Sequence, residues 1–277
     1  ITALAIIGFW HLFKKNKGEN MITALQVETL AKDYSIDTFS VIREYLQLLF
    51  LSYLYQQKEA DRIYFKGGTA IHFMFNSPRF SEDLDFSTIY SKEAIIKIVR
   101  QTEKEMQKEL PGNKAVILYS GKNGMRFRWR FIWKDFKYPL VIRLDFSMKP
   151  NLDQLKTASI MTRLPLTFSP IVVHLSAEEI LAEKIRAMMM RAKGRDVFDF
   201  WFLLRQKTPI KIDLVKKKLA EVGLKFNQKL LLAKVKNYPG KSLEADLNKF
   251  LPRNQRRIIK ILKEELLVSL TDEIKRL

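Results

Sequence analysis

The chain has 277 residues and a formal net charge of +19, from 49 Lys and Arg against 30 Asp and Glu. It contains no cysteine and only three histidines, which excludes disulfide scaffolds, thiolate metal sites and cysteine nucleophiles and argues against a multi-histidine zinc site. Carboxylate sites for hard metal ions stay open. The basic excess predicts a polyanionic partner, with nucleic acid first, nucleotide phosphates second and an anionic membrane surface third.

The N-terminus has an unusual order. Residues 1–13 are apolar and a basic segment follows, which reverses the order of a secretory signal and is too short to span a bilayer. The tetrapeptide Ile-Thr-Ala-Leu opens the chain and recurs directly after Met21, so residues 1–20 are interpreted as an extension, with a packed helix as the alternative. No other window reaches membrane length without charges, and we expect a cytoplasmic protein that does not contact membranes.

Helical and alternating apolar patterns are interleaved in the first part of the chain, residues 21–170, which predicts an α/β domain. The three strands predicted over 114–120, 125–134 and 138–147 are expected to form a meander. Residues 148–170 are expected to be mostly loop. The predicted helices are 23–32, 38–60, 69–75 and 91–109, and the predicted strands are 63–65, 84–87, 114–120, 125–134 and 138–147.

After a short predicted strand at 171–173, the pattern becomes helical to the end of the chain. This change predicts a second, helical domain over residues 171–277. The predicted helices are 176–192, 195–206, 211–221, 226–235, 242–249 and 253–276.

A double glycine precedes two closely spaced aspartates in the first domain. Gly67 and Gly68 let a phosphate approach the backbone closely, and the Thr69 hydroxyl can add a donor at the start of the following helix. Asp83 and Asp85 are at positions i and i+2 of a predicted strand and therefore share one face. Such carboxylates can hold magnesium and leave room for phosphate, and two ions about 3.5–4 Å apart would clamp the attacking and leaving oxygens.

Asp145 is the candidate for a third carboxylate. The tetrapeptide Leu-Asp-Phe-Ser occurs at 84–87 and again at 144–147, so neighbouring strands would bring all three acids together. Like charges this close repel each other without a cation, which favours a metal site. The alternative is that each aspartate is a solvated residue at a strand end.

A second group of charged residues lies on the predicted helices of the C-terminal half. Lys184 and Arg191 share one stripe of helix 176–192, so both could reach a triphosphate. Asp199 lies one turn into the next helix and could orient Lys184, whereas Asp196 stands where a first-turn carboxylate is favoured. A surface ion-pair network is the alternative.

Three polar residues near the double glycine have two interpretations each. Lys66 and Arg79 could hold phosphates or the acceptor, or could be solvated. Ser81 could bind the triphosphate or cap a turn.

A basic row is also predicted on one strand. Alternation places Arg126, Arg128 and Arg130 on one face and Phe127 and Trp129 on the other. An exposed row of this kind could follow a phosphate backbone.

These motifs resemble a known superfamily. Gly67-Gly68-Thr69, followed after thirteen residues by Asp83-Leu84-Asp85, resembles the G-[GS] and D-x-D signature of polymerase-β-like nucleotidyltransferases. More narrowly, Lys66–Ala70 and Arg79–Phe86 resemble the AbiEii/AbiGii-type toxins, which include the nucleotidyltransferase toxins of bacterial toxin–antitoxin systems. Residues 178–187 and 191–204 resemble the second conserved region of that group, and the resemblance covers roughly residues 60–205.

The resemblance implies an α+β fold, in which a small mixed β-sheet nucleotidyltransferase domain is followed by a helical domain that contributes Lys184 and Asp199. It implies a Mg²⁺-dependent enzyme, with two ions expected, that uses NTP as substrate. The residues implied for catalysis are Asp83, Asp85, Asp145, Lys184 and Asp199, of which the first three would bind metal. From their own chemistry and position, the residues expected to bind nucleotide are Gly67, Gly68, Thr69, Lys66, Arg79 and Ser81.

The function implied is that of a toxin that transfers a nucleoside monophosphate to RNA, with the 3′ end of tRNA favoured, and so blocks translation. A cognate antitoxin is an expected partner. Two alternatives stay open at this point: transfer to a protein hydroxyl, on the chain itself or on an antitoxin, and a non-catalytic basic module that binds nucleic acid.

Overall fold

The computed structural model describes residues 22–131, 139–148 and 152–275. Its contacts divide the chain into two units. The first comprises the described residues up to Met74 together with Glu82–His174, and the second comprises Phe75–Ser81 and the described residues from Leu175 onward. The predicted extension 1–20 lies outside the described residues.

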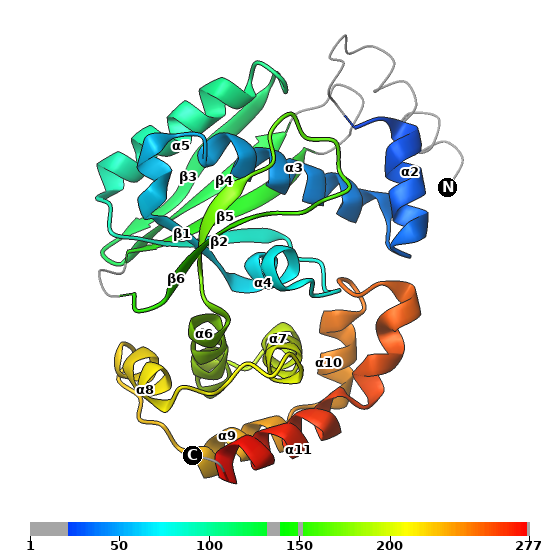
Figure 1. The fold of residues 1–277 in the computed structure, drawn as a ribbon, viewed down its shortest axis with the longest axis vertical. Coiled ribbons are helices and arrows are strands. Elements are labelled where there is room, and N and C mark those ends of the chain that lie inside the picture. Colours follow the sequence, from blue (N-terminus) through cyan, green and yellow to red (C-terminus); the bar gives the residue numbers. More distant parts are fainter. Residues whose placement is uncertain (1–21, 132–138, 149–151, 276–277) are drawn as a thin grey trace. The chain divides into compact units, whose positions relative to one another are not determined.

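The first unit is built on a mixed sheet, so the predicted α+β fold is confirmed (Figure 1). The described residues form seven strands in the order β3-β4-β5-β2-β1-β7-β6. The predicted meander is present, because β4 pairs antiparallel with both β3 and β5. In contrast, β5 and β2 run parallel, as do β1 and β7. The strands are β1 (Ile63–Lys66), β2 (Asp83–Thr88), β3 (Asn113–Gly121), β4 (Gly124–Phe131), β5 (Leu140–Met148), β6 (Leu155–Ser159) and β7 (Ile171–Leu175).

One face of this sheet packs on helices and forms the core. Phe50 of α3 lies edge-on against Trp129 of β4, with ring centroids 4.6 Å apart, and also contacts Phe86 of β2. Phe86 in turn stacks on Phe146 of β5. Because side chains alternate along a strand, the aspartates beside these aromatic residues face the opposite side. The helices of this unit are α2 (Ala24–Asp33), α3 (Thr38–Leu54), α4 (Gly67–Phe75) and α5 (Lys92–Met106), with a 3-10 helix η1 (Lys58–Arg62).

Two predicted helices are shorter than expected, and one strand was not predicted. The helix predicted over 38–60 ends at Leu54, where the Tyr55 hydroxyl donates to the carbonyl groups of Ile63 and Val173. The helix predicted over 253–276 divides into a 3-10 helix and a shorter α-helix. Within the predicted loop, β6 is a strand without buried residues, so it carries no apolar alternation that could reveal it.

The second unit is helical, with α7 at its centre. From Asp196 to Leu204 every residue of α7 is buried, and the helix contacts α6, α10 and α11. Segment 75–81 belongs to this unit, because the amide of Phe80 donates to the carbonyl of Phe250. The helices are α6 (Ala177–Met190), α7 (Gly194–Arg205), α8 (Ile212–Ala220), α9 (Gln228–Lys236), α10 (Gly240–Leu247), η2 (Arg253–Lys260) and α11 (Leu262–Lys275).

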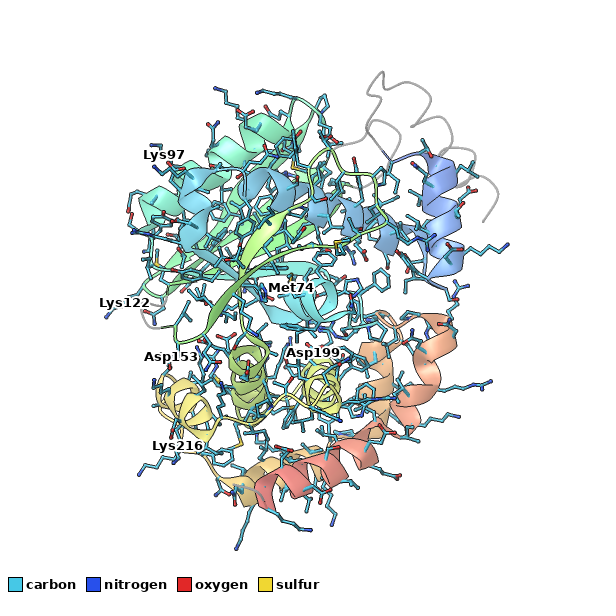
Figure 2. The ribbon with its side chains drawn as sticks, in the orientation of Figure 1. Met74, Lys97, Lys122, Asp153, Asp199 and Lys216 are labelled. Carbon is cyan, nitrogen blue, oxygen red and sulfur yellow. The ribbon has the colours of Figure 1, made fainter. Side chains whose placement is uncertain are left out.

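Charged side chains of the second unit fall into two classes. Lys216 of α8 points away from the helices into solvent, whereas Asp199 of α7 is enclosed among them (Figure 2). In the described part of the chain, no helix combines the length and apolar character needed to span a membrane.

Candidate active site

The turn between β1 and α4 requires glycine at residue 67. Gly67 has φ of +79°, in the left-handed region, and a side chain there would overlap the carboxylate of Asp85. Helix α4 begins at Gly67, two residues before its predicted start. The amides of Gly68 and Thr69 therefore belong to the first helical turn, where no carbonyl four residues earlier can accept from them within the helix. The backbone at this turn thus offers donors beside an acid.

Thr69 and Lys66 connect this turn to β2. The buried hydroxyl of Thr69 donates to the backbone carbonyl of Asp83. This hydrogen bond connects the start of α4 to the start of β2. Lys66 is the cross-strand partner of Asp85, which places both side chains on one sheet face. The turn is thereby fixed against the strand that carries the two aspartates.

The three predicted carboxylates share one face of the sheet. In β2, Leu84 is buried on the core side, whereas Asp83 and Asp85 are half-buried on the other. Strand β5 lies beside β2 in parallel, with Asp85 directly opposite Asp145. The two Leu-Asp-Phe-Ser segments are therefore paired residue for residue, which places two like charges next to each other.

Arginines bind two of these acids. The Arg143 guanidinium donates from Nε and Nη2 to the two carboxylate oxygens of Asp83, at 2.7 Å each. Arg126 donates from Nε to Oδ1 of Asp145 at 2.5 Å. The hydrogen bonds to Asp83, together with the negative charges of Asp83 and Asp145, raise the pKa of Arg143 above its ordinary value. Both arginine side chains are nearly half exposed, so these pairs lie at the surface of the unit.

The acids suit a hard cation by their chemistry. Carboxylate oxygens on one face are the ligands that Mg²⁺ prefers. Across residues 22–131, 139–148 and 152–275, however, no three acidic or histidine side chains are already gathered into a metal-binding group. The pairing with Arg143 and Arg126 accounts for this, because it turns the oxygens of Asp83 and Asp145 toward guanidinium groups.

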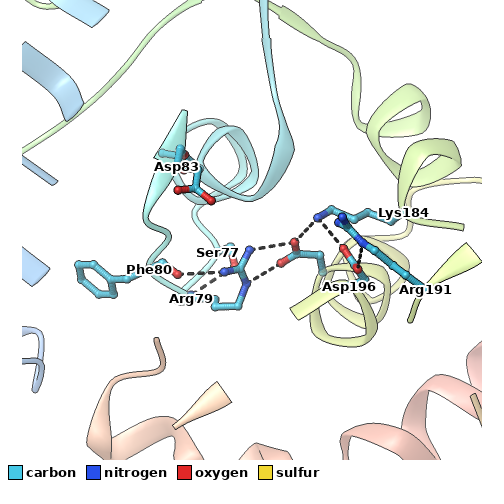
Figure 3. Close-up of polar contacts among 9 residues, drawn as sticks. Ser77, Arg79, Phe80, Asp83, Lys184, Arg191 and Asp196 are labelled. Atoms are coloured by element: carbon cyan, nitrogen blue, oxygen red, sulfur yellow. Dashed lines mark hydrogen bonds and ion pairs between the residues drawn. The ribbon is translucent and has the colours of Figure 1, made fainter. Parts of the chain in front are cut away.

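A second charged cluster surrounds Asp199 in the other unit. Its side chain is 0% exposed and accepts hydrogen bonds from Arg79 Nε and Nη2 at 2.8 and 2.9 Å. Lys184 Nζ lies 2.6 Å from Oδ2 of the same carboxylate, the oxygen that also accepts from Arg79 Nη2. Lys184 also reaches Asp196 at 3.4 Å, and Arg191 lies 3.3 Å from Asp196 (Figure 3). The cluster thus alternates in charge from Arg79 to Arg191.

The charges of this cluster stabilise one another in ionised form. Although burial acts to raise the pKa of Asp199, Arg79 and Lys184 outweigh it and hold that pKa below its ordinary value. Burial likewise acts to lower the pKa of Lys184, but Asp199 and Asp196 raise it overall. Lys184 is therefore a cation over the whole neutral range.

Arg79 and Lys184 differ in how far they are enclosed by the protein. Arg79 is 2% exposed, and its third nitrogen, Nη1, donates to the carbonyl of Phe80, so all three guanidinium nitrogens bind groups of the protein (Figure 3). Ser81 belongs to the same segment 75–81. Lys184, with 12% of its side chain exposed, is the less enclosed partner of Asp199. Arg191 and Lys184 both pair with Asp196, so Arg191 is not available as a second cation for the triphosphate.

Sequence reasoning missed Arg143 as a partner of the acids. Its signal was available, because Arg143 precedes Asp145 by two residues and so shares its face. The predicted alternation of β4 is confirmed, with Arg128 and Arg130 exposed and Trp129 buried.

The chain also matches a family model and several solved structures. The family model described as nucleotidyl transferase AbiEii toxin, type IV toxin–antitoxin system, matches residues 49–260. No curated protein is significantly similar to the chain in sequence.

Several solved structures share the fold. MenT4, a nucleotidyltransferase toxin from Mycobacterium tuberculosis H37Rv, is similar with a TM-score of 0.63 and 18% identity over 92% of each chain. JHP933 from Helicobacter pylori is similar with a TM-score of 0.54 and 20% identity, covering 86% of this chain and 92% of its own.

Proposed function

Because the chain belongs to the AbiEii family of nucleotidyltransferase toxins of type IV toxin–antitoxin systems, we propose that it transfers a nucleoside monophosphate from NTP to RNA, with the 3′ end of tRNA as favoured acceptor. Such a product would block translation. The observation that carries this proposal is that the Asp85 carboxylate occupies the space where a side chain at residue 67 would begin, with Asp145 beside Asp85. This arrangement joins a backbone turn able to bind phosphate to acids able to bind metal.

The acids of the first unit would hold the divalent cation. Asp83, Asp85 and Asp145 offer carboxylate oxygens on one sheet face, which suits Mg²⁺. When bound, Mg²⁺ supplies charge neutralisation for the triphosphate and lowers the pKa of the acceptor hydroxyl. Asp145 would also accept the proton of that hydroxyl.

The triphosphate would bind where α4 begins. The amides of Gly68 and Thr69 are placed at a helix N-terminus, which attracts phosphate oxygens. Lys66, on the same sheet face as Asp85, adds positive charge. In the reaction, an acceptor hydroxyl oxygen forms a bond to the α-phosphorus, the bond from that phosphorus to the oxygen bridging to the β-phosphate breaks, and pyrophosphate leaves.

Lys184 and Asp199 would have different roles. By family resemblance Lys184 neutralises charge on the leaving pyrophosphate, and its raised pKa keeps it protonated for that task. Asp199 is fully buried between Lys184 and Arg79, which suits a positioning role more than contact with substrate. Arg79 would accordingly support the site through Asp199.

The acceptor would be bound through its phosphates. Arg128 and Arg130 are exposed along β4, on the sheet face that carries the acids. Folded RNA presents closely spaced phosphates, and a formal charge of +19 favours such a partner over a small neutral one. A cognate antitoxin, expected for a toxin of this family, is part of the same proposal.

The proposal is tested by incubating the protein with each α-labelled NTP, Mg²⁺ and total RNA. We expect wild type to label RNA and the double variant Asp83→Asn, Asp85→Asn to lose at least about a hundredfold in rate. The matched control is Asp61→Asn, which removes an exposed acid at the opposite end of β1 and should retain wild-type labelling. Equal labelling by the double variant would refute the assigned site, and label that resists ribonuclease would identify a protein acceptor instead.

A non-catalytic module is the competing function. The exposed arginines of β4 alone would support RNA binding without chemistry. That alternative predicts salt-dependent RNA binding that does not respond to Mg²⁺ or NTP, and no label transfer with any of the four nucleotides.

A further inference from the structure

The pair formed by Arg143 and Asp83 concerns the proposed metal site directly. Two nearly parallel hydrogen bonds of 2.7 Å use both carboxylate oxygens of Asp83 at once. A divalent cation bound by Asp83 would need lone pairs of the same oxygens. It would also lie within a few ångströms of the guanidinium charge, where like charges repel strongly.

We propose that Arg143 is a positioning residue that occupies Asp83 in place of a divalent cation and must withdraw when the cation binds. This inference rests on the metal site of the proposed function. Cross-strand register supports it, because Arg143 lies directly opposite Asp83 and two residues before Asp145, on the sheet face that carries the three acids. The positive charge of Arg143 therefore offsets the repulsion between Asp83 and Asp145 before metal arrives.

The exchange is feasible because the pair is exposed enough to open. The Arg143 side chain is 44% exposed, and water screens such pairs, so breaking the pair costs little. The arginine side chain has several rotatable bonds and extends from an open sheet face, so it can withdraw without moving the strand. Arg126 binds Asp145 through one nitrogen only, and we expect it to compete less strongly.

The neighbouring strand offers a matched control. Arg128 of β4 is the cross-strand partner of Arg143 and lies on the same face, yet it makes no ion pair with any described residue. Replacing either arginine by methionine removes one positive charge from nearly the same place. Only the Arg143→Met variant also removes a group that binds the metal-facing oxygens.

The test measures Mn²⁺ binding without nucleotide, by electron paramagnetic resonance or calorimetry, on the full chain. We expect Arg143→Met to bind Mn²⁺ about three to ten times more tightly than wild type, and Arg128→Met to change the affinity by less than about twofold. Arg143→Lys, which keeps the charge but cannot form the two-pronged pair, should lie between wild type and Arg143→Met. Asp83→Asn should abolish the difference between arginine and methionine at residue 143.

Several outcomes would overturn the inference. Equal effects of Arg143→Met and Arg128→Met would show that only long-range charge is involved. Unchanged or weaker Mn²⁺ binding in folded Arg143→Met, or no binding in any variant, would show that no competition exists. If wild type still transfers label from NTP in those cases, the proposed function stands and only this inference fails. If wild type neither binds Mn²⁺ nor transfers label, the proposed function fails with it.

Discussion

The Arg79 guanidinium donates two hydrogen bonds to the Asp199 carboxylate, from a position 120 residues earlier in the chain. Both side chains are almost fully buried, and Lys184 contacts the same carboxylate. Together with the hydrogen bond from the Phe80 amide to the Phe250 carbonyl, this arrangement joins segment 75–81 to the helical unit. Arg79 lies in the first motif of the family resemblance, Arg79–Phe86, and Asp199 lies in the second, residues 191–204. Their hydrogen bonds therefore connect the two motifs.

We predict that Asp199→Asn destabilises the protein by about 3–5 kcal/mol, because it leaves two buried cations without their shared anion. Urea unfolding followed by circular dichroism would measure this loss. As a control, Asp213→Asn removes an exposed aspartate from the first turn of α8 and should cost less than about 1 kcal/mol. Similar costs for the two variants would contradict the assignment of Asp199 as the centre of the cluster.

The same cluster predicts a pH dependence. The folded-state pKa of Asp199 is depressed, so its stabilisation is complete above the unfolded pKa of about 3.9 and is lost as the pH falls through the lower folded value. Lys184 has a raised pKa, so its contribution is complete below about pH 10.4 and is lost only at higher pH. The stability difference between wild type and Asp199→Asn should therefore be constant from about pH 5 to 9 and shrink below pH 4. A difference that shrinks near neutral pH would contradict this ionisation scheme.

Alanine substitutions at Gly67 and Gly223 distinguish the cost of backbone strain from the effect of a direct overlap with Asp85. Both have positive φ, +79° and +71°, but a methyl group at Gly223 meets no atom within 4 Å, whereas at Gly67 it overlaps the Asp85 carboxylate. We expect Gly223→Ala to cost about 1–2 kcal/mol with wild-type nucleotidyl transfer. Gly67→Ala should cost more and abolish transfer, because Asp85 must move. Full transfer activity in Gly67→Ala would show that the glycine turn is not part of the active site.

The exposed arginines of β4 predict the salt dependence of RNA binding. Each phosphate contact that is removed should reduce the slope of log affinity against log salt by about 0.7 to 0.9. We expect the double variant Arg128→Ala, Arg130→Ala to reduce the slope by nearly twice that amount in filter-binding titrations. Lys216→Ala, at an exposed site on α8, should leave the slope unchanged. An unchanged slope in the arginine variant would place the RNA elsewhere.

Local patterns explain which features could be predicted. Alternation identified β2 and β4 and the faces of Asp83, Asp85 and the arginine row, because side-chain direction follows from strand geometry alone. The repeated Leu-Asp-Phe-Ser segment predicted that the three acids would come together if the two strands were neighbours, and β2 and β5 are neighbours. These inferences needed no information beyond spacing.

Long-range pairing could not be predicted in the same way. The partner of Asp199 is 120 residues distant, and no local pattern distinguishes Arg79 from other arginines. The ends of the helices near Leu54 and Ile261 depend on tertiary contacts and on 3-10 turns rather than on propensity. Strand β6 pairs at the sheet edge with polar residues on both faces, so periodicity could not reveal it.

The central claim is that the acids of β2 and β5 hold the metal while the start of α4 holds the triphosphate. Its most direct test is a crystal structure with Mn²⁺ and a nonhydrolysable NTP. We predict an anomalous Mn²⁺ peak within about 2.0–2.3 Å of Asp83 and Asp85 oxygens, Arg143 withdrawn from Asp83, and phosphate oxygens at the amides of Gly68 and Thr69. Mn²⁺ bound away from these acids, or a triphosphate bound away from the glycine turn, would contradict the account.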